Sequence, residues 1–145
     1  MTFPDIDSIE STIVGLLEAD VAITLPVTAF PGQVSEYIEQ KLKSASGIFL
    51  VAFASFQTVH GSEGEPDYRV TLEITVMSRD VSRHDSALPQ FTAAINACQG
   101  QTVTIGSEPF DVNVILGGYA GWWEDESIWA YTFACVLEPR LISFT

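Results

Sequence analysis

Two long strand-like segments, separated by a short polar stretch, occupy the middle of the sequence. In DYRVTLEITVMSR, residues 67–79, apolar and polar residues alternate strictly, which predicts a strand with one buried face. The segment before it, GIFLVAFASFQTV at residues 47–59, begins apolar on both faces, as is typical of a strand covered on two sides. Together the two segments predict a long β-hairpin, so the chain needs other elements to pack on a sheet.

Three segments carry the period of an amphipathic helix. The first runs from about residue 5 to 18, with acidic residues near its start, where the helix dipole favours anions. The second has an apolar face made of Val34, Ile38, Leu42 and Ala45 and ends at Gly47. The third begins near Ser86 and ends at Gly100, and its apolar stripe comprises Leu88, Phe91, Ile95 and Cys98.

The remaining segments predict short strands. Residues 21–30 are apolar and interrupted by Pro26, which favours extended chain or an edge strand. Residues 102–116 predict a second hairpin, and residues 127–139 predict the last strand. The glycine-rich residues 117–121 between them are expected to form a flexible connection. This order of elements predicts one α+β domain over residues 1–145, with a mostly antiparallel sheet of about five strands packed by about three helices.

Both alternating sets of the last strand are largely apolar, so we expect it to be covered on both faces. The bulkier set includes Trp129, Tyr131 and Phe133. Aromatic residues are enriched at interface cores, which favours a subunit interface, although a helix layer of the same chain would cover this face equally well. Trp122 and Trp123 lie before the strand, at a glycine-flanked tip, and are assigned to the same protein contact. A carbohydrate-stacking site is the alternative for these two residues.

Acidic residues outnumber basic ones by nineteen to six, giving a formal net charge of −13. A surface of this kind repels phosphate and argues against sequence-specific binding of nucleic acid, although solubility alone would also explain it. The acids gather in two clusters that have no compensating base. One cluster is Glu63, Glu65 and Asp67, and the other is Glu124, Asp125 and Glu126.

The sequence shows no arrangement that is typical of an active site. His60 and His84 have no nearby metal-ligating partner, and neither acidic cluster has the spacing of a calcium loop. We therefore expect no enzyme activity, no metal and no cofactor. Cys98 and Cys135 lack CxxC spacing and are expected to be buried and reduced. No apolar run is long enough to span a membrane, and the N-terminus lacks the pattern of a signal peptide.

Several small motifs occur in a consistent order along the chain. They are Phe30-Pro31-Gly32 before a short helix, Val51-Ala52-Phe53 in the first long strand, Ser78-Arg79 at the end of the second, Gly100 after a helix, and Trp129 and Tyr131 in the final strand. In this pattern the chain resembles the tail terminator proteins of Mu-like bacteriophages and prophages. It departs from the family at His84-Asp85-Ser86, where a glycine-containing helix start is expected.

The resemblance implies a structural role. Such proteins form a ring, typically of six copies, that caps the tail tube and meets the head-side connector. The implied partners are copies of the chain itself, the tail tube protein and the connector or neck protein. The implied location is the host cytoplasm during assembly and then the virion tail.

DNA that passes through such a ring must not bind to it. An acidic wall leaves the duplex free to slide, so we assign the two acidic clusters to loops that line the lumen. Two other functions remain open. One is another head–tail joining or minor tail component, and the other is a small ligand-binding module that uses Trp122, Trp123 and the adjacent acids.

Overall fold

The computed structural model describes residues 5–29, 47–59, 67–78, 87–115, 120–123 and 128–139, and these ranges form two helices and seven strands. The expected helix through Val34 and Ala45 lies outside them. In chain order the elements are α1 (Ile6–Glu18), β1 (Val27–Ala29), β2 (Gly47–Val59), β3 (Asp67–Ser78), α3 (Ala87–Cys98), β4 (Thr102–Ile105), β5 (Glu108–Ile115), β6 (Ala120–Trp123) and β7 (Ile128–Pro139).

All seven strands belong to one sheet. Six follow the order β1-β2-β3-β7-β5-β4, and β6 pairs with β7 off this path. The edge strand β1 runs parallel to β2, and the other described pairs are antiparallel. The α+β class is therefore confirmed, as is the edge strand near Pro26. The described sheet is mixed, however, and it has more strands than the five or so that we expected, while the described helices number two.

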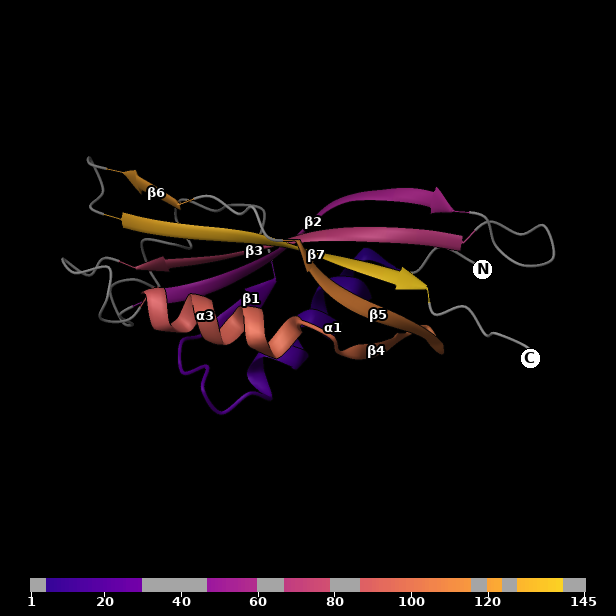
Figure 1. Ribbon diagram of the computed structural model, residues 1–145, viewed down its shortest axis with the longest axis horizontal. Coiled ribbons are helices and arrows are strands. Elements are labelled where there is room, and N and C mark those ends of the chain that lie inside the picture. Colours follow the sequence, from indigo (N-terminus) through magenta and orange to yellow (C-terminus); the bar gives the residue numbers. More distant parts are fainter. Residues whose placement is uncertain are drawn as a thin grey trace.

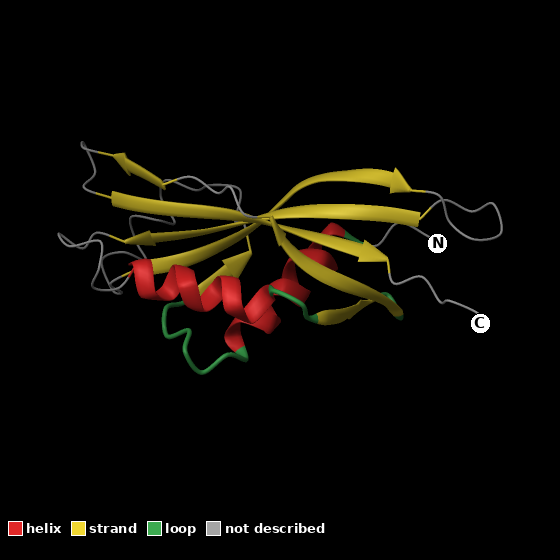
Figure 2. Ribbon diagram, in the orientation of Figure 1, coloured by secondary structure: helices red, strands yellow, loops and turns green. Residues whose placement is uncertain are grey.

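Both helices pack on the same face of the sheet (Figure 2). In α1 the residues Ile9, Ile13 and Leu17 are spaced four apart and are fully buried, so one stripe of the helix meets the sheet. The strands contribute alternate residues to the same core, because successive side chains point to opposite faces. The largest fully buried side chains of this core from the strands are Phe49, Phe110, Phe133, Leu72, Ile74 and Leu137.

The face of the sheet that points away from α1 and α3 is also apolar over one half. Met77 is 3% exposed and pairs with Ile48 on one side and with Ala130 on the other. Ile48, Leu50 and Ala130 are buried in the same half, and Val136 is buried in the other half, although none of the four belongs to the core under the helices. The expectation that β7 and the start of β2 are covered on both faces is therefore confirmed.

Two different strands pair with one edge of β7, each along a different part, and we call this edge the divided edge. Along the other edge, residues 129–137 pair with β3. On the divided edge, residues 134–139 pair with β5 and residues 128–131 pair with β6, so that β6 and β5 lie towards opposite ends of the molecule (Figure 1). Ala120 and Gly121 thus belong to a strand, which corrects the expectation of a flexible connection there. A four-residue segment that contains glycine carries no alternation of its own, and its pairing with β7 makes it a strand.

A β-bulge interrupts the β2–β3 hairpin. The register shifts between Phe53 and Ser55, so Ala54 is an extra residue on β2. Just before it, the Phe53 backbone amide donates a hydrogen bond of 2.8 Å to Oε2 of Glu10 on α1. Glu10 is only 8% exposed, and a buried carboxylate of this kind is stabilised by the backbone donor. The contact attaches α1 to the edge of β2 beyond the point where β1 ends.

Gln90 of α3 fixes the loop between α1 and β1. Its Oε1 accepts hydrogen bonds from the backbone amides of Thr24 and Leu25, at 2.9 and 3.3 Å, and its Nε2 donates to the carbonyl of Ala22 at 2.9 Å. Because Gln90 is buried, these bonds satisfy polar groups that would otherwise be costly to remove from water. Gln90 therefore fixes the position of residues 22–25, which precede β1.

The second hairpin forms as expected, with a two-residue turn between β4 and β5. Gly106 and Ser107 have φ values of 58° and 68°. Positive φ at both central positions is the conformation of a type I′ turn, whose twist matches that of the flanking strands.

Candidate functional site

The bulky face of β7 is covered by the chain itself. Tyr131 is 7% exposed and Phe133 is 2% exposed. Both rings contact Phe91 of α3, with 5.6 Å between ring centroids in each case. Of the two covers that the sequence left open, a helix layer of the same chain is the one present. A neighbouring subunit could reach Tyr131 and Phe133 only if α3 moved away.

The backbone of the β6–β7 hairpin carries all three tryptophans. The register pairs Trp122 with Trp129 and Trp123 with Ile128. This hairpin lies at the end of the molecule opposite to β4 and β5 (Figure 1). The role of the tryptophans in a protein contact stays a prediction, and the backbone pairing gathers them at one end of the sheet.

Each of the two acidic clusters adjoins the end of a described strand in the sequence. Asp67 begins β3, whereas Glu63, Glu65, Glu124, Asp125 and Glu126 lie outside the described residues. The other end of β3, Ser78, pairs with Trp129 near the start of β7. At about 3.3 Å per residue, a strand of this length separates its two ends by about 35 Å. The strand ends that flank the two clusters therefore lie at opposite ends of the sheet.

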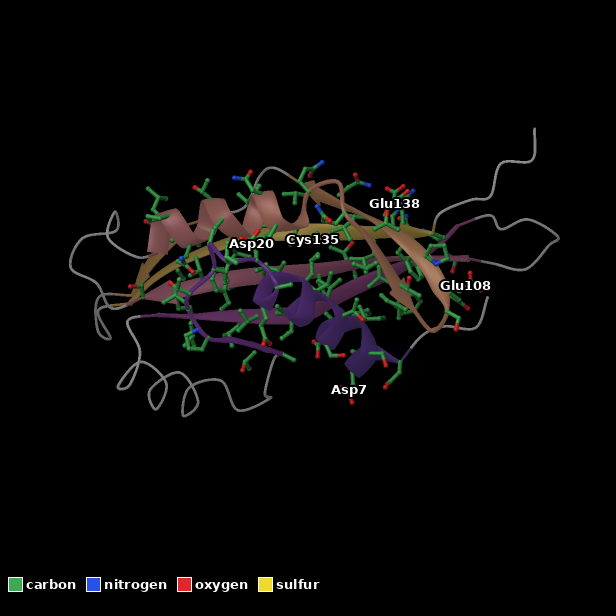
Figure 3. The ribbon with its side chains drawn as sticks, turned by 90° about the horizontal axis from the view of Figure 1, so that it is seen from below. Asp7, Asp20, Glu108, Cys135 and Glu138 are labelled. Carbon is green, nitrogen blue, oxygen red and sulfur yellow. The ribbon has the colours of Figure 1, made fainter. Side chains whose placement is uncertain are left out.

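Arg69 is the one basic residue in the described ranges. Its Nε lies 3.5 Å from Oε1 of Glu138, and its Nη1 donates to Oε1 of Gln57 at 3.4 Å. Acidic residues are spread over the molecule, as Figure 3 shows for Asp7, Asp20 and Glu108. The described acids are Asp5, Asp7, Glu10, Glu18, Asp20, Asp67, Glu73, Glu108, Asp111 and Glu138. The described part of the chain thus has no basic patch that could hold a nucleic acid backbone.

An aromatic group near the far end of the β2–β3 hairpin was not anticipated from the sequence. Phe53 and Phe56 have ring centroids 6.4 Å apart, and Phe56 meets Tyr68 edge-on at 6.1 Å. In a regular strand, residues three apart point to opposite faces, but the bulge at Ala54 turns both rings to the same side. We call Phe53, Phe56 and Tyr68 the hairpin aromatic patch. No sequence signal could have revealed it, because the bulge is a property of the register between β2 and β3.

The two thiols lie together in the core, between α3 and β7. Cys98 and Cys135 are free and fully buried, which confirms the expectation for both residues. A hydrogen bond with Cys98, together with burial, raises the pKa of Cys135 far above its ordinary value. Cys135 lies within β7, in the middle of the molecule (Figure 3).

We expect both thiols to react slowly with a thiol reagent in the native protein. The thiolate is the reactive form, and the raised pKa of Cys135 keeps this group neutral. The unfolded chain loses this proton above about pH 8.5, whereas the folded chain keeps it, so stability should fall by up to about 1.4 kcal/mol per pH unit above that value. Labelling with Ellman's reagent, with and without urea, together with urea titrations at pH 7 and 9.5, tests both expectations. Rapid labelling of the native protein would contradict the placement of α3 on β7.

No group of three or more histidine, cysteine, aspartate and glutamate side chains in the described ranges is arranged to hold a metal ion. His60 and His84 lie outside those ranges. Neither α1 nor α3, the helices described, is long and apolar enough to cross a membrane.

Comparison with known proteins shows a similarity in structure. No protein-family model matches the sequence, and no curated protein matches it. A solved structure does match: a chain from the virion of a native gene transfer agent particle, with 13% sequence identity and a TM-score of 0.62. The match covers 90% of this chain and 92% of the other. At this identity the similarity establishes a shared fold along nearly the whole length of both chains.

Proposed function

We propose that this chain is a structural protein of a phage-like particle, a tail terminator that forms a ring, caps the tail tube and joins it to the head-side connector. The observation that carries the proposal is the fold shared with a chain of a gene transfer agent virion, over 90% of one chain and 92% of the other. The order of small motifs that resembles tail terminators of Mu-like phages supports it independently.

The proposed role is non-enzymatic. The partners are further copies of the chain, the tail tube protein and a connector or neck protein. Assembly takes place in the host cytoplasm, and the chain then stays in the virion tail. In a ring of several copies, each copy contacts the next through two different surfaces, head to tail. The rotation between neighbours must close on itself, since the same kind of contact without closure would produce fibres. The scarcity of basic residues suits a channel that DNA passes without binding.

Deletion of the gene tests the proposal directly. A terminator stops tube growth, so particles made without it should contain tubes of irregular length, with no heads attached, in electron micrographs. The purified protein, alone or with tube protein, should form a closed multimer by native mass spectrometry. Tubes of normal length that lack heads would instead indicate another head–tail joining component. Normal infectious particles would contradict a role in the tail.

A further inference from the structure

The loop between α1 and β1, residues 19–26, carries an apolar tip on the surface. Val21 is 96% exposed, whereas the other exposed large apolar side chains of the described ranges are at most 54% exposed. Ala19, Ala22 and Pro26 of the same loop are exposed as well. The loop lies on the helix side of the sheet and forms the lowest part of the molecule in Figure 2. Apolar side chains therefore gather at a projecting part of the surface.

Hydrogen bonds and buried side chains hold this tip in one conformation. Oδ1 of Asp20 accepts a hydrogen bond of 2.9 Å from the backbone amide of Ala22, and the Asp20 carbonyl accepts one of 3.1 Å from the amide of Ile23. Gln90 holds the following residues from α3. Ile23 and Leu25, each 9% exposed, anchor the loop in the core. Because the tip is ordered before a partner binds, binding costs little conformational entropy.

The tip belongs to an uncharged part of a strongly acidic chain. Residues 21–29, which comprise most of the loop and the edge strand β1, include no aspartate, glutamate, lysine or arginine. The charged residues just before them are Glu18 and Asp20, and the Asp20 carboxylate already accepts the amide of Ala22. Each copy of the chain has a net charge of −13, so two copies repel each other least where charges are absent. An uncharged, apolar tip is therefore suited to a contact between two copies.

We propose that the loop of residues 19–26 docks on the next copy of the same chain, with Val21 inserted among apolar side chains of that copy. The inference rests on the proposed function, because it assigns a surface to the contact between neighbours in the ring. Such a contact joins two different surfaces, so the loop of one copy meets a part of the next copy other than its loop.

A single charge at the tip tests the proposal. Val21→Asp should raise the protein concentration needed for the closed multimer by about tenfold or more, because the contact would bury an unpaired carboxylate. Thr104→Asp is the matched control, since Thr104 is exposed on β4, at the opposite edge of the sheet from β1, and receives the same charge. This variant should assemble like the wild type. Native mass spectrometry of the full chains, with tube protein present, measures assembly, and circular dichroism checks the fold.

The outcomes separate this inference from the proposed function. Assembly of folded Val21→Asp at the same concentration as the wild type would overturn the inference and leave the proposed function in place. Equal loss of assembly in both variants would also overturn it, since the effect would then come from charge alone. If Val21→Asp fails to fold, Val21→Ser provides the test without a charge, with an expected weakening of about fivefold. A wild type that forms no closed multimer would contradict the proposed function and this inference together.

Photo-crosslinking in particle-producing cells identifies the partner of the tip. Val21 of the full chain is replaced by benzoylphenylalanine, and the adduct is analysed by mass spectrometry. We expect an adduct of two copies of the chain, in which position 21 of one copy is joined to a residue outside the loop of the other. An adduct with a different protein alone, a link between the two loops, or no adduct would overturn the proposal.

Discussion

Gly47→Ala should lower the free energy of unfolding by about 1–3 kcal/mol, the usual cost of overpacking a core. A Cβ at Gly47 would lie 2.7 Å from the Met77 carbonyl oxygen and 2.9 Å from Cδ1 of Leu25. The carbonyl belongs to the backbone of β3, which pairs with β2 at this point and cannot shift alone. Leu25 is held by the hydrogen bond from its amide to Gln90. We therefore expect a value near the upper end of the range.

Gly15→Ala is the matched control for this experiment. Gly15 lies inside α1, and a Cβ there would have no atom within 4 Å. Alanine is favoured over glycine in a helix by about 0.5–1 kcal/mol, so this variant should be more stable than the wild type. Urea titrations followed by circular dichroism measure both differences. Equal stability of Gly47→Ala and wild type would show that β2 and β3 do not approach as closely as described.

Replacing an acidic cluster that faces the ring axis by lysines should reduce DNA delivery by on the order of tenfold or more, because each lysine that meets a phosphate adds affinity for the passing duplex. One variant changes Glu63, Glu65 and Asp67, and the other changes Glu124, Asp125 and Glu126. The strand ends that flank the two clusters in the sequence lie at opposite ends of the sheet. Each variant is therefore the matched comparison for the other, with the same change in charge at a different place.

Both lysine variants should fold, since charges at loop positions contribute little to stability. Infectivity of assembled particles and binding of the purified variants to duplex DNA at low salt provide the two measurements. The wild type should show no binding to DNA. Normal infectivity of both variants, with rings that still assemble, would contradict the idea of an acidic lumen but would leave the structural role in place.

Most elements of this fold could be predicted because their signals are local. The alternation in residues 67–79 and the helical spacing of Ile9, Ile13 and Leu17 depend only on neighbouring residues. The strand β6 could not be predicted in this way, because its strand character comes from pairing with β7. The bulge at Ala54 was hidden for a similar reason, since it is a property of the register between two strands. As a result, the exposed position of Phe56 was missed.

The candidate site was harder to predict than the fold. An aromatic set such as Tyr131 and Phe133 has the same pattern whether α3 or another subunit covers it, because both covers bury the same apolar surface. The contacts of Tyr131 and Phe133 with Phe91 show that α3 is the cover, and these contacts are visible only in the three-dimensional structure. The acidic clusters are evident in the sequence, whereas the separation of the strand ends that flank them follows only from the pairing of Ser78 with Trp129.

Because two different strands pair with the divided edge of β7, the strand pairing at one end of the protein can change without altering the pairing at the other end. Residues 128–131 depend on β6, and residues 134–139 depend on β5, while β3 supports nearly the whole strand from the other side. Lengthening or shortening the β6–β7 hairpin therefore leaves the register of β5 unchanged. One end of such a molecule can change its shape while the end formed by β4 and β5 keeps its own pairing.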